Sequence, residues 1–183
     1  MKYFKYLIQF LFVVSLFLIF KILGPRLSSY IGGKIFELVG PFFRSKEIIH
    51  SNIKRAFPKI NTLDLKKMTR KMWNNYGRVF AEYMFIKNFR YGHLAANIKI
   101  EGQNILDDIK NKNQQVVFVS GHFSNFELMA LTLEKNGIKL LTIYRPLNNV
   151  FLNRIMEGIR KKYICKNQIK KGVGGLKKLL YLK

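Results

Sequence analysis

The sequence predicts an α/β fold preceded by an N-terminal membrane-anchor helix and a helical lead-in. Three observations carry this prediction: an uncharged apolar run at residues 6–20, helical spacing of apolar residues up to about residue 95, and alternating strand and helix patterns beyond it. We therefore expect an anchor at residues 1–25, a helical membrane-proximal segment at 26–95, and a partial α/β domain at 96–183.

The expected anchor reads YLIQFLFVVSLFLIF from residue 6 to residue 20, with Lys5 and Lys21 at its ends. Because lysine side chains can reach the interface from helix ends, the usable span covers roughly residues 4 to 23, and a spanning helix needs roughly 17–25 residues. A cleaved signal peptide fits poorly, since no small-residue cleavage site follows the run. A buried core helix is disfavoured because the run has no polar stripe.

The bias in lysine and arginine predicts on which side of the membrane the chain body lies. Lys2 and Lys5 precede the apolar run, whereas the nearby basic residues after it are Lys21, Arg26, Lys34, Arg44 and Lys46. The heavier, C-terminal side is expected to face the cytoplasm. A helix that lies in the interface would give the same placement, so the anchor is either transmembrane or interfacial.

Helical segments are expected to follow the anchor, which ends at Gly24-Pro25. The interrupted apolar stretch at 27–43 predicts a short helix at the membrane surface, and residues 45–57 a helix that Pro58 stops. Residues 62–85 predict a longer helix, whose expected buried stripe is Leu63, Met68, Met72, Trp73, Tyr76 and Phe80.

Strand and helix patterns alternate in the remainder of the chain. Strands are expected at residues 97–101, 115–120 and 139–144, and helices at 105–112, 125–135, 150–163 and from 172 onward. Gly137 is expected to close the helix before it as a C-terminal cap.

His122 and Glu127 stand at the junction between the expected strand at 115–120 and the helix after it. Within one helix, five residues would leave them about 140° apart. If the helix begins near Ser124, Glu127 falls in its first turn and can point back at the imidazole. A carboxylate there would fix the tautomer, and the free ring nitrogen could remove a proton from a substrate hydroxyl. The alternative is a capping box of Ser124 with Glu127, without catalysis.

The charge balance favours anionic partners. The chain carries 33 Lys+Arg against 10 Asp+Glu, a formal net charge of +23. Nucleic acid, an anionic membrane face and an acidic protein are all compatible with it. The apolar anchor and the lack of a nucleic-acid-binding module count against nucleic acid. Cys165 is the single cysteine, so no disulfide or zinc cluster can form within the chain, and we expect it to be a core or surface thiol.

Several ordered motifs carry a resemblance that covers essentially the whole chain. The segment from Gly121 to Glu127 (GHFSNFE) resembles the HxxxxE signature of the bacterial lipid A late acyltransferases, which transfer lauroyl and myristoyl groups. Residues 144–149 (YRPLNN) are similar to that family's next block. The lead-in pattern is similar at Phe43-Arg44, His50-Ser51-Asn52 and Ala56-Phe57-Pro58.

The resemblance implies a membrane-bound acyltransferase at the cytoplasmic face of the bacterial inner membrane. Such an enzyme moves a fatty acyl group from acyl carrier protein to a hydroxyl of a lipid A precursor, without metal or cofactor. It implies His122 as the catalytic base and Glu127 as its support, with Asn125, Arg145 and Arg160 as substrate-binding residues. By their positions alone, Arg145 is equally explained as a solvated residue at a strand end, and Arg160 as part of a basic helix face. The partners implied are acyl carrier protein, the lipid A precursor and the anionic inner membrane.

The chain departs from the family pattern in length, since the resemblance implies about another hundred residues of sheet and site. We therefore expect a C-terminally truncated form, and an inactive remnant is an alternative function. A glycerolipid acyltransferase is a second alternative, disfavoured because YRPLNN replaces the arginine block expected there.

Overall fold

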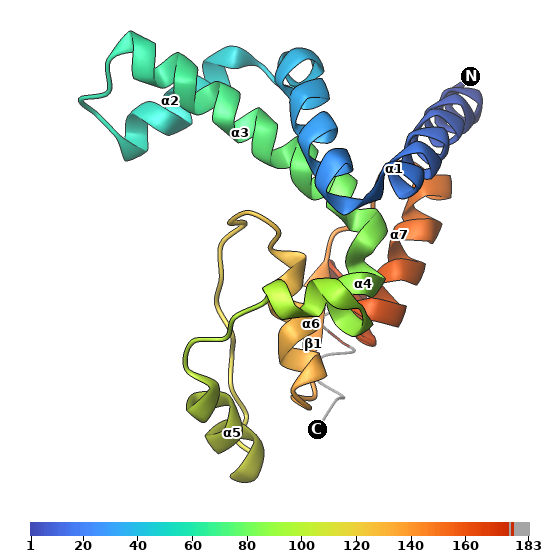
Figure 1. The fold of residues 1–183 in the computed structure, drawn as a ribbon, viewed down its shortest axis with the longest axis vertical. Helices are drawn as coiled ribbons and strands as arrows, with labels where there is room; N and C mark the ends of the chain where they lie inside the picture. The colour runs from blue at the N-terminus through green and yellow to red at the C-terminus, as the bar shows by residue number, and fades with distance from the viewer. Residues whose placement is uncertain (176, 178–183) are drawn as a thin grey trace. The chain divides into compact units, whose positions relative to one another are not determined.

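Helices dominate the chain in the computed structural model, which describes residues 1–175 and 177 (Figure 1). The described elements are α1 (Lys2–Val39), η1 (Gly40–Phe42), α2 (Lys46–Ala56), α3 (Thr62–Glu82), η2 (Tyr83–Phe85), α4 (Ile86–Tyr91), η3 (His93–Asn97), α5 (Gln103–Asn111), α6 (Glu127–Lys135), β1 (Leu141–Tyr144), α7 (Val150–Tyr163) and β2 (Asn167–Lys170). They fall into two compact units, one of Leu16–Phe85 and one of Met1–Ser15 with Ile86–Lys183.

The expected end of the anchor at Gly24-Pro25 is confirmed as a break between two helical arms of α1. Gly24 has φ 76° and ψ 169°, outside the helical region, yet the helix resumes and continues to Val39. Pro25 suits the start of this second arm, because its missing N–H falls where a helix has no partner for it. The prediction of a second helix in the stretch at 27–43 is therefore confirmed as the second arm of α1, which ends at Val39, and its position at a membrane surface stays a prediction.

Glycines allow the second arm of α1 to approach α3 closely within the Leu16–Phe85 unit. A Cβ added at Gly77 would lie 2.0 Å from the carbonyl oxygen of Gly32, and one at Gly32 would lie 2.6 Å from that of Gly77. Polar groups join the same two helices, since Ser29 Oγ donates to Glu82 Oε1 at 2.8 Å. Gly32, which interrupts the apolar stretch in the sequence, therefore lies at the contact between α1 and α3.

The α2–α3 hairpin confirms the two helices predicted around Pro58. Ser45 caps α2 and Asn61 caps α3. The side chain of Asn61 accepts a hydrogen bond from the backbone N–H of Asp64 at 2.9 Å. The predicted stripe of α3 is only partly correct: Trp73 is buried, but Leu63 and Tyr76 are exposed. The buried positions of α3 are Leu65, Trp73, Gly77 and Ala81.

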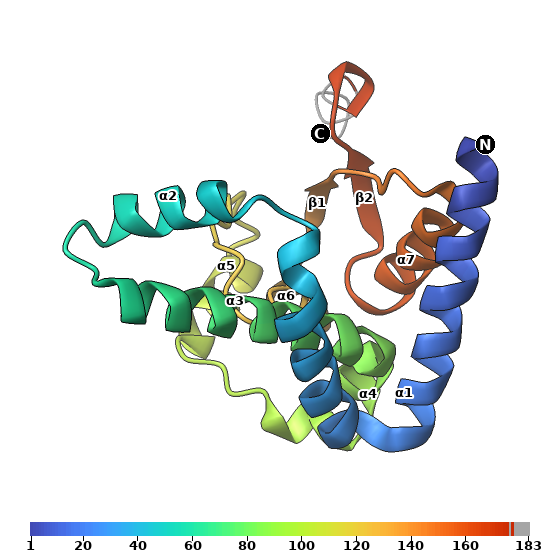
Figure 2. The same cartoon turned by 90° about the horizontal axis from the view of Figure 1, so that it is seen from above.

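The unit of Met1–Ser15 with Ile86–Lys183 contains the sheet, which consists of β1 and β2 (Figure 2). The strands are parallel, with Leu141 opposite Asn167 and Tyr144 opposite Lys170, and α7 makes the crossover that parallel pairing requires. The fully buried side chains of this unit are Ile86, Leu131, Ile164 and Cys165.

In this unit most of the predicted helices are confirmed, whereas most of the predicted strands are not. The helices at 105–112, 125–135 and 150–163 are confirmed as α5, α6 and α7, and the strand at 139–144 as the shorter β1. The strands predicted at 97–101 and 115–120 are wrong, and β2 was not predicted. A strand requires a partner for its backbone groups, and within the described residues only β1 and β2 pair. The helix predicted from 172 onward lies largely at residues 176 and 178–183, outside the described residues.

Candidate functional site

His122 lies in irregular backbone ahead of α6 and is exposed. Its ring packs against that of Phe126, with centroids 4.3 Å apart and planes inclined at 50°. Nearby Ser124 has φ 43°, in the left-handed region that few residues other than glycine adopt. The predicted strand-to-helix junction is therefore a loop-to-helix junction.

Helix α6 begins at Glu127, later than predicted, and its start is not a capping box. Phe126 occupies the N-cap position and makes no side-chain cap hydrogen bond. The capping-box alternative is therefore wrong, because Ser124 lies two positions before the N-cap and has a left-handed backbone conformation. At the other end, Gly137 with φ 86° confirms the predicted C-terminal cap. There the N–H of Ile138 donates to the carbonyl of Leu133 at 3.2 Å, the bond of a Schellman motif.

Glu127 is buried and paired with Arg160 of α7. Arg160 donates to the same carboxylate oxygen, Oε1, from Nε at 2.9 Å and from Nη2 at 2.6 Å. The side chains are 8% and 21% exposed, so the pair is largely shielded from water. Arg160 is therefore not a solvated residue of a basic helix face. No hydrogen bond joins His122 to Glu127 in the described part of the chain, and the expected contact between them is not formed.

A second polar cluster adjoins Arg160 and was not anticipated from the sequence. The Tyr144 hydroxyl donates to Glu157, which also accepts from Asn153 Nδ2 at 2.8 Å and pairs with Lys170 at 3.4 Å. Burial, with the hydrogen bond to Glu157, raises the pKa of Tyr144 to about 12. The hydrogen bond from Tyr144 in turn lowers the pKa of Glu157.

Helical spacing along α7 could have revealed this cluster. Asn153, Glu157 and Arg160 are separated by four and then three residues, and such positions share one face of a helix. The Arg160 guanidinium also lies 6.0 Å from the centre of the Tyr144 ring, within reach of a cation–π contact. The face therefore links the Glu127–Arg160 pair to the sheet.

Arg145 and Asn125, the other predicted substrate-binding residues, differ in their exposure to solvent. Arg145 follows β1, is exposed, and has no ion pair among the described residues. Asn125 is half-buried just before α6, and its carbonyl accepts from the N–H of Leu128 at 3.1 Å. Asn149, the last residue of YRPLNN, is buried and caps α7 by accepting from the N–H groups of Phe151 and Leu152.

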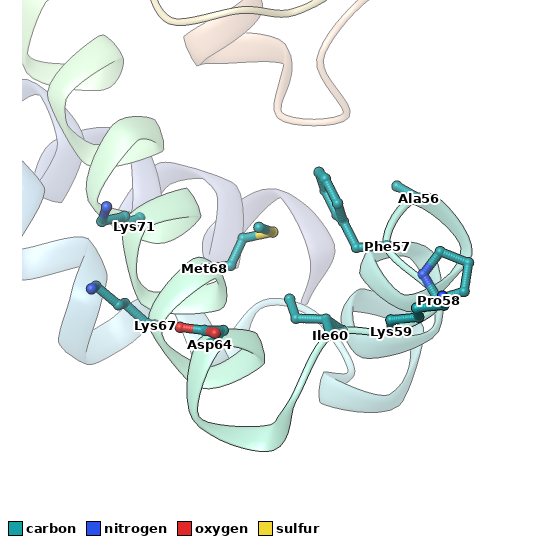
Figure 3. A pocket seen from close by; sticks show the side chains of 9 residues that line it. All are labelled: Ala56, Phe57, Pro58, Lys59, Ile60, Asp64, Lys67, Met68 and Lys71. Atoms are coloured by element: carbon teal, nitrogen blue, oxygen red, sulfur yellow. The ribbon is translucent and has the colours of Figure 1, made fainter.

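Two of the hollows on the described surface are lined largely by apolar side chains. The first, of about 470 Å³, borders α5 and α6 and is lined largely by apolar side chains: Ile98, Ile100, Ile105, Leu106, Phe118, Leu128, Met129 and Leu133. The second, of about 710 Å³, lies in the α2–α3 hairpin, where Phe57, Ile60 and Met68 line it together with lysines (Figure 3). No predicted site residue lines either hollow, but Leu128 and Met129 follow Glu127 directly.

Cys165 is fully buried, and burial raises the pKa of its thiol. Its Sγ lies 3.3 Å from the carbonyl oxygen of Leu140 and 3.2 Å from that of Asn167. A buried neutral thiol of this kind is a packing residue and not a nucleophile. The prediction of a core or surface thiol is confirmed, as a core thiol.

Among the described residues, one helix, Lys2–Phe42, is long and apolar enough to cross a membrane, judged by length and composition. These features together define a mainly helical chain with an apolar N-terminal helix and a histidine–acid segment at a helix start.

Comparison with known proteins narrows this class to a family. Residues 1–180 match the family model described as bacterial lipid A biosynthesis acyltransferase. The chain belongs to this family. No curated protein and no solved structure matched the chain.

Proposed function

We propose that this chain transfers a fatty acyl group from acyl carrier protein to a hydroxyl of a lipid A precursor, with His122 as the general base. The observation that carries the proposal is the family match across residues 1–180, which spans both His122 and Glu127. The exposure of His122 supports it, because a substrate hydroxyl can reach its ring without a rearrangement of the core.

The proposed step needs only one proton carrier. An imidazole nitrogen of His122 takes the proton of the acceptor hydroxyl as its oxygen attacks the thioester carbonyl. The tetrahedral intermediate collapses, the carbon–sulfur bond breaks, and the imidazolium returns the proton to the leaving thiolate. An ester and a free carrier thiol result, so the step balances without a metal or another cofactor.

Glu127 is proposed to support His122 through its second carboxylate oxygen. Both hydrogen bonds from Arg160 go to Oε1, and Oε2 has no hydrogen bond among the described residues. Oε2 can therefore accept from the imidazole N–H once substrate draws the loop inward, since catalytic hydrogen bonds often tighten only in the complex. In this proposal Arg160 holds the carboxylate in place while Glu127 orients the ring.

The proposed setting is the cytoplasmic face of the inner membrane. The basic residues that follow the apolar run favour that side. The net charge of +23 suits an acidic carrier protein, a phosphorylated acceptor and anionic lipid. Arg145 and Asn125 are proposed to contact substrate; Arg145→Ala should then raise KM while leaving kcat nearly unchanged.

The apolar hollow beside α6 is proposed to hold the acyl chain. Ligand sites for apolar groups are lined by hydrophobic side chains with few polar groups, as this one is. Met129→Trp should fill the hollow and shift the preference toward shorter acyl donors. Ile143→Trp, a matched substitution at an exposed position of β1 outside the hollow, should leave chain-length preference unchanged.

The test of the reaction compares His122→Ala and Glu127→Ala with His93→Ala, a matched change at another exposed histidine. Membranes containing each variant are assayed with acyl-acyl carrier protein and a lipid A precursor, and with lysophosphatidate as a competing acceptor. We expect His122→Ala to lower the rate on the order of 10² to 10⁴, Glu127→Ala to lower it severely, and His93→Ala to have little effect. Near-normal turnover by His122→Ala would show that it is not the base, and acylation of lysophosphatidate alone would assign a glycerolipid enzyme.

A further inference from the structure

The Ala56-Phe57-Pro58 motif has no part in the proposed reaction, and in the structure it lines the hollow of about 710 Å³ in the α2–α3 hairpin. This hollow lies entirely within the Leu16–Phe85 unit. Its volume falls within the range of roughly 300–1,000 Å³ that is typical of ligand pockets. Three of its apolar side chains, here called the interior residues, are Phe57, Ile60 and Met68, and its three lysines, here called the border lysines, are Lys59, Lys67 and Lys71.

Backbone hydrogen bonds hold the wall that carries Phe57 in place. The N–H of Phe57 donates to the carbonyl of Ile53 at 2.8 Å, and the N–H of Ile60 donates to the carbonyl of Phe57 at 3.1 Å. Asn61 then caps α3, so the loop is fixed at both of its ends. Phe57 nevertheless remains 52% exposed. An apolar ligand in the hollow would remove this surface from water, which is favourable.

Helix α3 supplies the other wall and separates apolar from charged groups. Asp64, Lys67, Met68 and Lys71 line the hollow at positions three and four residues apart, which share one face of a helix. Figure 3 shows Met68 on the side of Phe57, whereas Lys67 and Lys71 extend along α3 away from Phe57. Lysine side chains can line apolar surface with their stems while their charges stay in water. The hollow therefore has an apolar interior and a cationic border, as an amphiphilic ligand requires.

The charges of the border lysines are not neutralised by the protein. None of the three forms an ion pair within the described part of the chain. The carboxylate that lines the hollow, Asp64, accepts a hydrogen bond from Asn61 Nδ2 at 2.8 Å at the start of α3. Between residues 45 and 71 the acidic residues are Glu47 and Asp64, against eight basic ones, namely Lys46, Lys54, Arg55, Lys59, Lys66, Lys67, Arg70 and Lys71. The hairpin thus attracts anions and leaves the border lysines available to bind them.

An anionic phospholipid matches both parts of the hollow. Its phosphate complements the border lysines, and its acyl chain complements the interior residues. A small soluble anion would leave the interior in water, and single-stranded nucleic acid binds by stacking on several aromatic side chains, whereas Phe57 is the one aromatic residue that lines the hollow. Phospholipid is also at hand, because the chain carries a helix apolar enough to cross a membrane.

We propose that the α2–α3 hairpin binds one anionic phospholipid, with its phosphate at the border lysines and an acyl chain against the interior residues. The lipid is bound and is not a reactant. This inference rests on the proposed function only in placing the chain at a membrane, and it adds a lipid site that is separate from the histidine–acid segment. The apolar part of the site distinguishes it from a diffuse attraction between a basic surface and an anionic bilayer.

The first test places a fluorescent reporter in the hollow of the whole chain. Trp73→Phe removes the single tryptophan, and Phe57→Trp then adds one indole at the interior. The protein is reconstituted in phosphatidylcholine nanodiscs that contain brominated phosphatidylglycerol or, at the same mole fraction, brominated phosphatidylcholine. Because bromine quenches on contact, we expect several-fold stronger quenching by phosphatidylglycerol. Tyr76→Trp in the same background, at an exposed position of α3 outside the hollow, is the control and should be quenched equally by both lipids.

The second test separates the border lysines from the overall charge. Lys67→Gln with Lys71→Gln is compared with Lys46→Gln with Lys54→Gln, which removes the same charge outside this hollow. A lysine near an anionic lipid surface contributes about fivefold to binding, so the first pair should lower the preference for phosphatidylglycerol by about 5- to 25-fold. The control pair should change it less than about twofold, because its lysines do not border the hollow. Thermal unfolding followed by circular dichroism checks that both pairs fold alike.

Three results would overturn the proposal. Equal quenching of the reporter by the two lipids would show that the hollow does not select an anionic head group. An equal loss of preference in both lysine pairs would show diffuse attraction and no site. A response of the reporter to added acyl carrier protein, with none to phosphatidylglycerol, would make the hollow a protein-docking surface. These readouts do not depend on turnover, so a failure of the proposed reaction would be seen separately in the acyl-transfer assay of His122→Ala.

Discussion

Removal of the Arg160 guanidinium tests the interaction that organises the candidate site. Arg160→Ala leaves the Glu127 carboxylate, whose side chain is 8% exposed, without the two hydrogen bonds at 2.9 and 2.6 Å. Breaking a buried pair on one side typically costs 3–5 kcal/mol, and the partial exposure of Arg160 places our expectation at about 3 kcal/mol. For a chain of this size, that corresponds to a fall in Tm of about 6–12 °C.

The assay is thermal unfolding of purified protein in detergent, followed by circular dichroism. Arg160→Lys keeps the charge but loses the paired donors and should cost about 1 kcal/mol. Replacing both partners, as Arg160→Met with Glu127→Leu, should restore much of the loss, because apolar side chains can substitute for a buried pair. Lys161→Ala, at an exposed neighbouring position, should stay within about 0.5 kcal/mol of the parent. If Arg160→Ala behaved like Lys161→Ala, or if the double replacement were additive, the pair would not stabilise the fold.

The remaining predictions concern a helix cap, a helix contact and a titration. Asn149→Ala removes both the cap of α7 and the donor to α1, so the free energy of unfolding should fall by about 1–2 kcal/mol. Asn148→Ala, at the exposed neighbouring position, should be neutral. Equal melting temperatures of the two variants would contradict the cap. Gly77→Ala places a methyl group 2.0 Å from a backbone oxygen and should lower the free energy of unfolding by about 3 kcal/mol or more. Gly158→Ala meets open space on α7 and should raise the free energy of unfolding by about 0.5–1 kcal/mol. Denaturant titration would distinguish the two effects. Because burial and a hydrogen bond to a carboxylate raise the pKa of Tyr144 to about 12, the unfolded chain, with a tyrosine pKa of about 10, ionises first. The stability that Tyr144 contributes is therefore present below about pH 10 and lost between about pH 10 and 12; Tyr144→Phe should flatten that part of the curve, and an unchanged slope would refute the assignment.

The sequence predicted helices well because their signals are local. Pro58, the cap residues and apolar spacing place α2, α3 and α7 within a few residues of the prediction. The cap at Gly137 was also correct, since a left-handed residue at that point favours glycine. The HxxxxE and YRPLNN motifs, read by resemblance, indicated the family that the match over residues 1–180 shows.

Tertiary structure decided what depends on partners distant in the chain. The run at 115–120 has strand composition, yet it remains irregular because no neighbouring strand pairs with it among the described residues. The polar β2 was missed for the converse reason, since its pairing with β1 and not its composition makes it a strand. Pairing is a long-range property that a local pattern does not contain.

By itself, the sequence determined the helical framework, the apolar N-terminal helix and the family. Only the tertiary structure decided that Glu127 binds Arg160 across 33 residues, and that neither a cap nor His122 takes that carboxylate. It also decided that Phe17 and Phe20 of α1 are buried, with their rings beside that of Phe80 of α3. The physical reason is the same in both cases: a carboxylate or a helix face takes the partner that the fold brings within a few ångströms, and residue spacing along the chain does not specify which partner that is.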